Sequence, residues 1–580
     1  MKRKLLMAGL LLGMGAASAQ MKNPDTLVTL TFGDWGTGFD PAYCYDSACG
    51  NVLENTLETL FGLQGTSASK IEPLLAAEIP TKANGGISAD GKTYTVKLRK
   101  NARFSDGTPV TAQDVEYSLE RMMVYSTDVG PAGLLLEPLL GSADLIRKGG
   151  KVGYDAIDKA VETRGNDTVV FKLAKPFGPF LNVLAFYGAS VYSKNAAVKA
   201  GDWSGTARDW EKFNNAAEGS SAFAKTGMVG SGPFTIERYD VGKNVVLKRN
   251  DRYWRPVAKL NRVIIQSVAD ETTRIQMLRS GDADMANQNA ISNPQLATVE
   301  KIPGVKVSKV PILSLVGMFL THKIDGTGTN YLGSGKLDGK GIPSDFFSDK
   351  NVRKAFAYSF DYNTMVKDVL AGIGSQQNTV LVKGLTGYNA AAPKYKFDKA
   401  LATKYFQAAW GGKVWENGFT LPVFFNSGNT TRQRALEILK RNIESINPKF
   451  KIEVRELQFS QILSQSAAHK MTVWLGGWGA DFADTHSFAQ PFLHSAGNYP
   501  QNMNYKNAQL DKLIDQAVAE SNPAARTKIY TQIARLGFEE VPLIPIYQAM
   551  GTYVHNGWVK GRQLNPMYSS DYYYTISKSN

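Results

Sequence analysis

The sequence has few of the residues that metal and redox chemistry need. Its 580 residues include two cysteines and five histidines. Two cysteines exclude a scaffold of several disulfides and a multi-cysteine zinc or iron–sulfur protein, and five scattered histidines leave little room for a histidine-rich metal site. No apolar run after the N-terminal segment reaches the roughly 18 residues that a membrane-spanning helix needs. We therefore expect a large ordered protein with no metal and no cofactor.

The charged residues are numerous but do not predict a nucleic-acid surface. The formal net charge is +14, and a clustered excess of this size would suggest a nucleic-acid footprint. Here lysines and arginines are dispersed among acidic residues, and no block of five like charges occurs. We expect no nucleic-acid partner and interpret the charge as a long-range field that favours solubility.

The first 19 residues have the pattern of a secretory signal peptide. Lys2, Arg3 and Lys4 precede an apolar stretch over residues 5–17, and Ala19 ends a small-residue cleavage pattern before Gln20. This arrangement predicts a signal peptide over 1–19 with cleavage between Ala19 and Gln20. Because no cysteine follows the cleavage point, no lipid anchor is expected. An exported, unanchored protein suits a periplasm.

The two cysteines lie close together in a turn-rich stretch. Cys44 and Cys49 are separated by four residues. An oxidising compartment would allow a local disulfide between them. A metal or redox role is disfavoured because the sequence places no partner ligands nearby.

Hydrophobic periodicity predicts strands that alternate with helices, which is typical of α/β sheets. We expect a strand over residues 27–32 and a helix over 51–61. A second helix should start at an N-cap Thr111 and reach Met123, and a third should cover 271–280. Residues 324–345 are rich in glycine and aspartate with almost no apolar position, so they predict an exposed inserted loop.

Enzyme motifs are absent or weak. Neither the G-x-S-x-G pattern of a nucleophile elbow nor the H-E-x-x-H pattern of a zinc protease occurs after residue 19. Asp481 and Asp484 form the strongest acid pair, and they could act as the acid and base of a glycosidase or bind a divalent cation together with His486. Most aspartates in such irregular stretches cap turns or helices instead.

Several segments together resemble the family 5 extracellular solute-binding proteins, the ligand-capturing subunits of ABC importers. They occur in the family's order and cover nearly the whole chain after residue 19. The segments are 72–76, 90–99, 104–115, 230–234, 249–254, 274–284, 351–356, 478–481, 510–511 and 544–547.

The resemblance implies the two-lobed periplasmic binding protein fold of type II, in its large class with an extra subdomain. Lobe I would comprise 20–65, 230–311 and 554–580, the extra subdomain 66–229, and lobe II 312–553. Two hinge strands, crossing near Leu313 and Gln548, would join the α/β lobes. Ligand capture would then occur by hinge closure.

The same resemblance implies where a ligand binds. Asp481 corresponds to the carboxylate that pairs with the ligand's α-ammonium in the family's peptide binders. Trp478 corresponds to an aromatic pocket residue that stacks on the ligand. Tyr45 lies in a strand-to-helix loop of lobe I, and such loops face the cleft in two-lobed binders.

The resemblance leaves three functions open. The main hypothesis is a monomeric, non-enzymatic subunit that captures oligopeptides or dipeptides and docks transiently on an ABC permease in the membrane. Dipeptide binders of the family carry an arginine for the ligand carboxylate in the segment that is 424–428 here, but only Arg432 and Arg434 lie nearby. This departure argues against strict dipeptide specificity and leaves room for longer peptides. The alternatives are the same fold binding an oligosaccharide or other small solute, and an exported hydrolase using Asp481 and Asp484.

Overall fold

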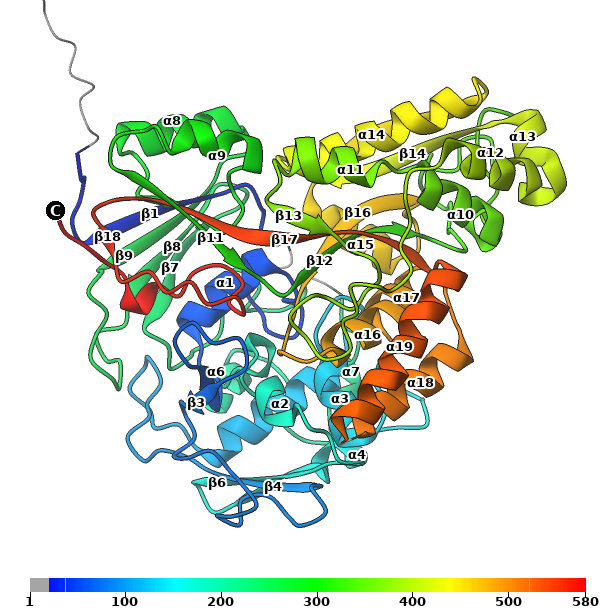
Figure 1. The fold of residues 1–580 in the computed structure, drawn as a ribbon. Coiled ribbons are helices and arrows are strands. Elements are labelled where there is room, and N and C mark those ends of the chain that lie inside the picture. The colour runs from blue at the N-terminus through cyan, green and yellow to red at the C-terminus, as the bar shows by residue number, and fades with distance from the viewer. Residues whose placement is uncertain (1–19, 37, 218, 521) are drawn as a thin grey trace, which may run out of the picture.

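The computed structural model describes residues 20–36, 38–217, 219–520 and 522–580, so the predicted signal peptide lies outside the described residues. A mixed sheet runs through the molecule (Figure 1) in the order β15-β14-β16-β12-β17-β10-β1-β9-β8-β7, with β11 and β13 also pairing with β17. Its strands are β1 (Thr26–Thr31), β7 (Phe234–Asp240), β8 (Asn244–Arg249), β9 (Arg262–Ser267), β10 (Met285–Ala286), β11 (Val305–Pro311), β12 (Ser314–Leu320), β13 (Gly374–Gln376), β14 (Phe419–Asn426), β15 (Phe450–Leu457), β16 (Val473–Gly479) and β17 (Leu543–Asn556).

Two chain segments connect the two parts of this sheet. The long strand β17 pairs with β12 near its start and with β10 and β11 near its end. The second connection is the passage from β11 to β12 through Ile312 and Leu313. Both crossings lie where the hinge strands are expected. We keep the names lobe I, subdomain and lobe II for the segments predicted above.

Each part of the sheet contains parallel strands linked through helices, which explains the α/β pattern in the sequence. In lobe I, helix α8 (Glu271–Ser280) connects β9 to β10, and both strands pair parallel to β1. In lobe II, α14 (Thr430–Ile446) connects β14 to β15, which pair parallel to each other. Figure 1 shows α8 and α14 on the same side of the sheet.

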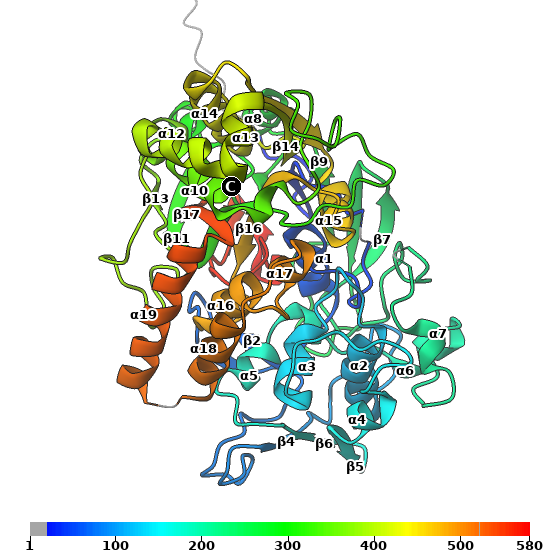
Figure 2. The same cartoon turned by 90° about the vertical axis from the view of Figure 1, so that its right-hand side faces the viewer.

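The subdomain has its own small sheet, β4 (Thr93–Lys97), β6 (Thr168–Lys172) and β5 (Val161–Arg164), packed near helix α2 (Ala112–Tyr125). Thr111 and Asp114 cap α2 reciprocally through side-chain and backbone groups, as the sequence predicts. Figure 2 shows the subdomain helices beside four helices of lobe II. These are α16 (His486–Leu493), α17 (Asn498–Asn502), α18 (Ala508–Ala519) and α19 (Pro523–Glu540).

A buried ion pair attaches the subdomain to lobe I. Both Nη atoms of Arg121 on α2 donate to Asp40 at 2.7 Å, and Arg121 also contacts Asp202 at 2.8 Å. The side chains of Arg121 and Asp40 are fully buried. Burial alone would raise the pKa of Asp40, but Arg121 and the hydroxyl of Ser221 hold it below the ordinary value.

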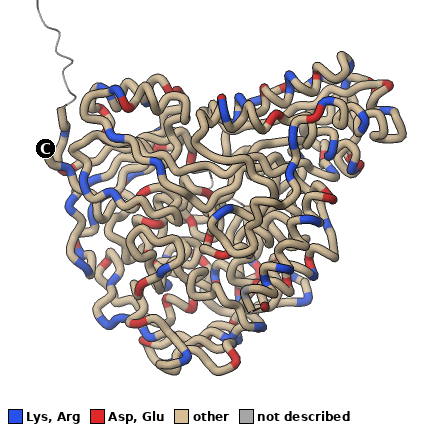
Figure 3. Tube along the Cα trace, viewed as in Figure 1, with Lys and Arg blue, Asp and Glu red and all other residues tan. Residues whose placement is uncertain are grey.

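Most predicted elements are confirmed to within a residue or two. β1 covers Thr26–Thr31, and α8 has the predicted bounds with Gly281 in the left-handed region at its end. The disulfide between Cys44 and Cys49 is present. Figure 3 shows lysine and arginine interspersed with aspartate and glutamate over the molecule, in agreement with the dispersed charge of the sequence.

Two predictions about local structure are wrong. The helix expected over 51–61 is α1 (Ser47–Thr56), because the carboxylate of Asp46 accepts from two backbone amides and starts it earlier, and the chain is extended from Leu57. The loop over 324–345 has no helix or strand but is not wholly exposed, since Ile324 and Ile342 are buried in the lobe II core. In the described part of the chain, no helix combines the length and the apolar composition that crossing a membrane requires.

Replacing Arg121 by glutamine should leave two buried aspartates without their cation. We expect the free energy of unfolding to fall by about 3–5 kcal/mol, measured by chemical denaturation at neutral pH. The matched control is Arg535→Gln, which removes an exposed ion pair with Glu539 and should cost less than about 1 kcal/mol. Equal losses for the two variants would contradict a structural role for the buried pair.

Candidate functional site

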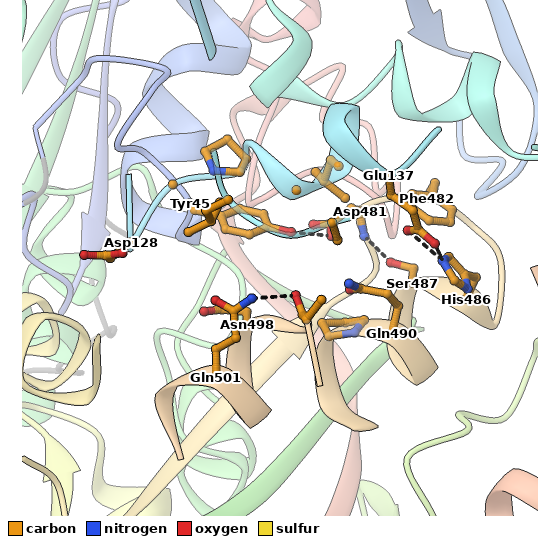
Figure 4. Close-up of a pocket in the computed structure, with 18 of the residues that line it drawn as sticks. Tyr45, Asp128, Glu137, Asp481, Phe482, His486, Ser487, Gln490, Asn498 and Gln501 are labelled. Carbon is orange, nitrogen blue, oxygen red and sulfur yellow. Dashed lines mark hydrogen bonds and ion pairs between the residues drawn. The ribbon is translucent and has the colours of Figure 1, made fainter. Parts of the chain in front are cut away.

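Asp481 lies two residues after the end of β16, at the boundary between lobe II and lobe I. Its side chain is only 8% exposed. The hydroxyl of Tyr45 donates to Oδ2 at 2.9 Å, and the Asp481 backbone amide donates to the Ser487 hydroxyl at 2.9 Å. Among the described residues, Oδ1 of Asp481 accepts no hydrogen bond. Figure 4 shows Tyr45 and Asp481 pointing toward each other.

The structure brings Tyr45, Trp478 and Asp481 together, as the resemblance implies. The rings of Tyr45 and Trp478 are 5.2 Å apart and meet edge to face. The indole N–H of Trp478 donates to the Ser487 carbonyl at 3.0 Å, so this nitrogen is already satisfied. Trp478 therefore contributes an apolar wall to the site through its ring.

The loop that carries Tyr45 is fixed on both sides. The disulfide joins Cys44 to Cys49 around it, and Asp46 caps α1 directly after it. These constraints limit the movement of Tyr45 relative to the sheet and position its hydroxyl at the boundary between the lobes.

The glycine pair before Asp481 serves close packing within a strand. β16 continues through Gly476 and Gly477 and ends at Gly479. A Cβ on Gly476 would lie 2.4 Å from the Trp474 ring and 2.6 Å from Phe319. A Cβ on Gly477 would lie 3.0 Å from the guanidinium of Arg432.

Arg432, noted in the sequence as a nearby arginine, donates to the Asn426 side chain at 2.6 Å. It forms no ion pair with any described residue. Burial lowers its pKa from the ordinary arginine value. Arg434, the other candidate, is exposed on α14.

The predicted lobes and subdomain touch one another around the site, so the structure is in a closed arrangement. The contacts come from α3 (Gly133–Leu140), α15 (Phe459–Ala467), α16 (His486–Leu493), α18 (Ala508–Ala519) and adjoining loops. They join Tyr45 to Asp481, Glu137 to His486 at 2.8 Å, Asp34 to Ser460 at 2.6 Å and Lys175 to Asp515 at 3.1 Å.

Two cavities share Asp481 and Phe482 as lining residues. Cavity 1, between the subdomain and lobe II, has a volume of about 60 Å³ and is bordered by Tyr45, Glu137 and His486 among others (Figure 4). Cavity 2 has a volume of about 220 Å³ and is formed mostly by lobe I, the subdomain and residues 563–575, which we call the C-terminal segment. Asp481 therefore stands at the junction of the two spaces.

The electrostatic state of Asp481 follows from its burial. Desolvation raises the pKa of Asp481 from 3.8 to about 8, and the hydrogen bond from Tyr45 opposes this rise. Burial and the neighbouring Asp481 carboxyl raise the pKa of the Tyr45 hydroxyl as well. A cation entering beside Asp481 would stabilise the ionised carboxylate, so the site favours a positively charged group.

The acid pair of the hydrolase hypothesis is not brought together at one cavity. Both oxygens of Asp484 accept from Arg526 at 2.7 Å, and Asp484 lines neither cavity 1 nor cavity 2. His486 binds Glu137 instead of joining the two aspartates. Over the described ranges no cluster of three or more His, Cys, Asp or Glu side chains could hold a metal ion.

Sequence reasoning missed most of the lining of cavity 2. Glu54 lies on α1, Glu72 on β3 (Ile71–Pro73), Arg255 in a loop, and Tyr568 and Tyr572 in the C-terminal segment. These positions are separated by up to 518 residues in the sequence, so no local pattern connects them. The available signal was a pair of charged residues, Glu54 and Glu58, among the apolar positions of a predicted helix.

Comparison with known proteins assigns the family. The sequence model of "Bacterial extracellular solute-binding proteins, family 5 Middle" matches residues 70–500. The chain belongs to this family. The matched range includes Trp478 and Asp481 and ends before β17 begins at Leu543.

Similar proteins cover almost the whole chain. The "Probable D,D-dipeptide-binding periplasmic protein DdpA" of Escherichia coli K12 is 27% identical over 482 residues, which are 83% of this chain and 81% of that protein. The glutathione-binding protein GsiB of Escherichia coli O1:K1 is 25% identical over 92% of both chains. The solved structure of the Escherichia coli murein tripeptide binding protein MppA has a TM-score of 0.79 at 19% identity and covers 97% of this chain and 99% of its own. The two-lobed periplasmic binding protein fold is thereby confirmed.

Replacing Asp481 by asparagine should change how stability depends on pH. Folded Asp481 keeps its proton up to about pH 8, whereas an unfolded aspartate loses its proton near pH 4. Between these values the folded state binds more protons, so the contribution of Asp481 to stability falls as pH rises. We expect the Tm of Asp481→Asn minus that of the wild type, measured without ligand, to become more positive across this window. A constant difference would contradict the raised pKa.

Proposed function

We propose that the protein captures short peptides in the closed cleft, with the peptide's N-terminal ammonium held by Asp481, and delivers them intact to the permease of an ABC importer. The half-satisfied, buried carboxyl of Asp481 is the observation that carries this proposal. The names of the relatives, which refer to a D,D-dipeptide, glutathione and a murein tripeptide, support it.

The chemistry of the anchor explains why a free amine would be selected. An ammonium has three donors, and Oδ1 of Asp481 is an acceptor without a partner among the described residues. A charge-assisted hydrogen bond in a site shielded from water is stronger than a neutral one. An N-acetylated peptide would present an amide, which could not ionise Asp481.

The closed arrangement implies how the ligand enters. Because Asp481 is 8% exposed and contacts Tyr45 of lobe I, a ligand can reach it only after the lobes separate. The crossings at Leu313 and Gln548 are the proposed hinges. Ligand binding would then favour the closed population through contacts that exist only in that state.

The remaining parts of the proposal concern location and chemistry. The signal pattern over 1–19 and the extracellular family support export to a periplasm without a lipid anchor. The engagement of Asp484 by Arg526 leaves Asp481 without a second catalytic carboxylate, which supports a binding protein that does not alter its ligand. We propose that it acts as a monomer.

The anchor is tested with Ala-Ala-Ala and its N-acetylated form. We expect the acetylated peptide to bind at least about a hundredfold more weakly to the wild type, measured by titration calorimetry, because a buried charge pair is lost. Asp481→Asn should lose this preference, whereas the control Asp282→Asn, which changes an exposed residue far from the cleft, should retain it.

Equal affinity for the two peptides would contradict the anchor role of Asp481. Binding of oligosaccharides but of no peptide would favour the sugar alternative, and cleavage of a bound compound would favour the hydrolase.

Closure is tested by small-angle X-ray scattering. The ligand-free protein should have a larger radius of gyration than the protein saturated with a binding peptide, since the cross-lobe contacts must open to admit the ligand. An identical scattering profile in both states would contradict capture by hinge closure.

A further inference from the structure

We propose that cavity 2 receives the side chain of the peptide's first residue and selects a basic one, lysine or arginine. This inference rests on the proposed function, because it takes the ammonium at Asp481 as its starting point. A side chain attached to the carbon next to that ammonium must enter a space that borders Asp481. Cavities 1 and 2 both border Asp481.

Volume distinguishes the two spaces. In the measure in which a single water needs about 10–15 Å³, cavity 1 offers about 60 Å³ and cavity 2 about 220 Å³. Only cavity 2 has room for a long side chain beside a bound ammonium. Its walls come from lobe I, the subdomain and the C-terminal segment, with Asp481 and Phe482 closing one end.

The charge of the lining favours a cation. Cavity 2 is lined by the four carboxyl groups of Glu54, Glu58, Glu72 and Asp481 but by only one cationic side chain, Arg255. Asp481 is more than nine-tenths buried, and its Oδ1 lacks a partner in the described chain. Acid groups therefore outnumber cationic groups around the space, and the free oxygen of Asp481, which the proposed function assigns to the ammonium, sets where the first side chain begins.

The carboxyl groups differ in how strongly they are already engaged. Glu58 accepts from the Tyr253 hydroxyl and the Trp254 indole, both at 2.7 Å, so its role is structural. Glu54 accepts from the backbone and hydroxyl of Ser569. The carboxylate of Glu72 has neither a hydrogen bond nor an ion pair with any described residue, which leaves it available to a ligand.

The titration of these groups agrees with that assignment. Burial raises the pKa of Glu54 to about 8, against the hydrogen bonds from Ser569. Burial also raises the pKa of Glu58. A cation in cavity 2 would relieve the cost of ionising both groups.

Aromatic rings add a second attraction for a cation. Phe186, Tyr187, Tyr568, Tyr572 and Tyr574 line cavity 2. The rings of Tyr568 and Tyr572 stack at 5.4 Å. Aromatic faces attract ammonium and guanidinium groups and also pack against the apolar stem of a lysine or arginine.

Arg255 does not reverse this preference. Its guanidinium lies 5.3 Å from the Tyr574 ring and 5.8 Å from the Trp254 ring, so it is held against aromatic faces. It forms no ion pair with a described residue. Its charge would repel a basic side chain placed next to it. If Arg255 dominated the cavity, the protein would select an acidic first residue, and this is the competing outcome of the test.

The test compares tripeptides that differ only in the charge of one side chain. Lys-Ala-Ala and norleucine-Ala-Ala have the same straight stem, and only the first carries a charge. We expect the wild type to bind Lys-Ala-Ala about tenfold more tightly, as for one charged hydrogen bond, measured by titration calorimetry. Ala-Ala-Lys and Ala-Ala-norleucine should bind equally, which would place the effect at the first residue.

Variants locate the preference in cavity 2. Glu72→Gln and Glu54→Gln keep the shape of the side chain and remove its charge, and each should reduce the advantage of Lys-Ala-Ala. The control Glu211→Gln changes an exposed carboxylate on α7 (Trp210–Phe213), outside the cavity, and should keep the full advantage.

The outcomes separate this inference from the proposed function. If Lys-Ala-Ala and norleucine-Ala-Ala bind with equal affinity, or if Glu-Ala-Ala binds best, selection by cavity 2 is overturned while peptide capture stands. A lysine advantage that survives in both Glu72→Gln and Glu54→Gln also overturns it. If no tripeptide binds, the proposed function itself fails.

Discussion

A carboxyl group removed from water without a cation beside it is the constraint on which this site depends. In the closed structure Asp481 is almost completely buried and receives one hydrogen bond, from Tyr45 across the boundary between the lobes. Burial raises its pKa to about 8. In the closed state Asp481 therefore lacks a cationic partner among the described residues, and a ligand that supplies a positive charge would stabilise its ionised form.

The scaffold maintains this arrangement from both sides of the boundary. On the lobe II side, Gly476 and Gly477 let large side chains pack directly on β16, and Ser487 binds both Trp478 and Asp481. On the lobe I side, the disulfide and the cap at Asp46 fix the loop that carries Tyr45. Contacts between residues close in sequence, such as the Cys44–Cys49 disulfide and the bond from Asp481 to Ser487, thus position the Tyr45–Asp481 contact between the lobes.

The segment 481–486 could have formed a catalytic or metal site if the side chains of Asp481, Asp484 and His486 had pointed to one place. Instead Asp484 pairs with Arg526, and His486 pairs with Glu137 of the subdomain. Both pairings strengthen the packing around Asp481, and the His486–Glu137 pair joins lobe II to the subdomain. Asp484 and His486, which the sequence offers as catalytic or metal-binding residues, are therefore structural here. Of the three residues, Asp481 alone is left as a carboxyl group at the junction of the two cavities.

Local elements were predictable because their causes are local. The cap at Thr111 and the left-handed Gly281 mark helix ends in the sequence itself. The prediction of a helix over 51–61 was wrong because Leu57 and Leu60 lie after the helix, in a non-helical segment that is also buried. A short run of apolar residues is buried in a helix and in an extended segment alike, so the sequence pattern does not distinguish the two.

The sequence by itself determined the α/β class and the order of the segments, and motif resemblance pointed to three residues that the structure brings together, Tyr45, Trp478 and Asp481. Only the tertiary structure decided which charges are neutralised: Asp484 by Arg526, Asp40 by Arg121, and Asp481 by no described cation. It also assembled cavity 2 from α1, β3 and the C-terminal segment. The physical reason is that desolvation and charge pairing depend on neighbours in space, and those neighbours are hundreds of residues apart along the chain.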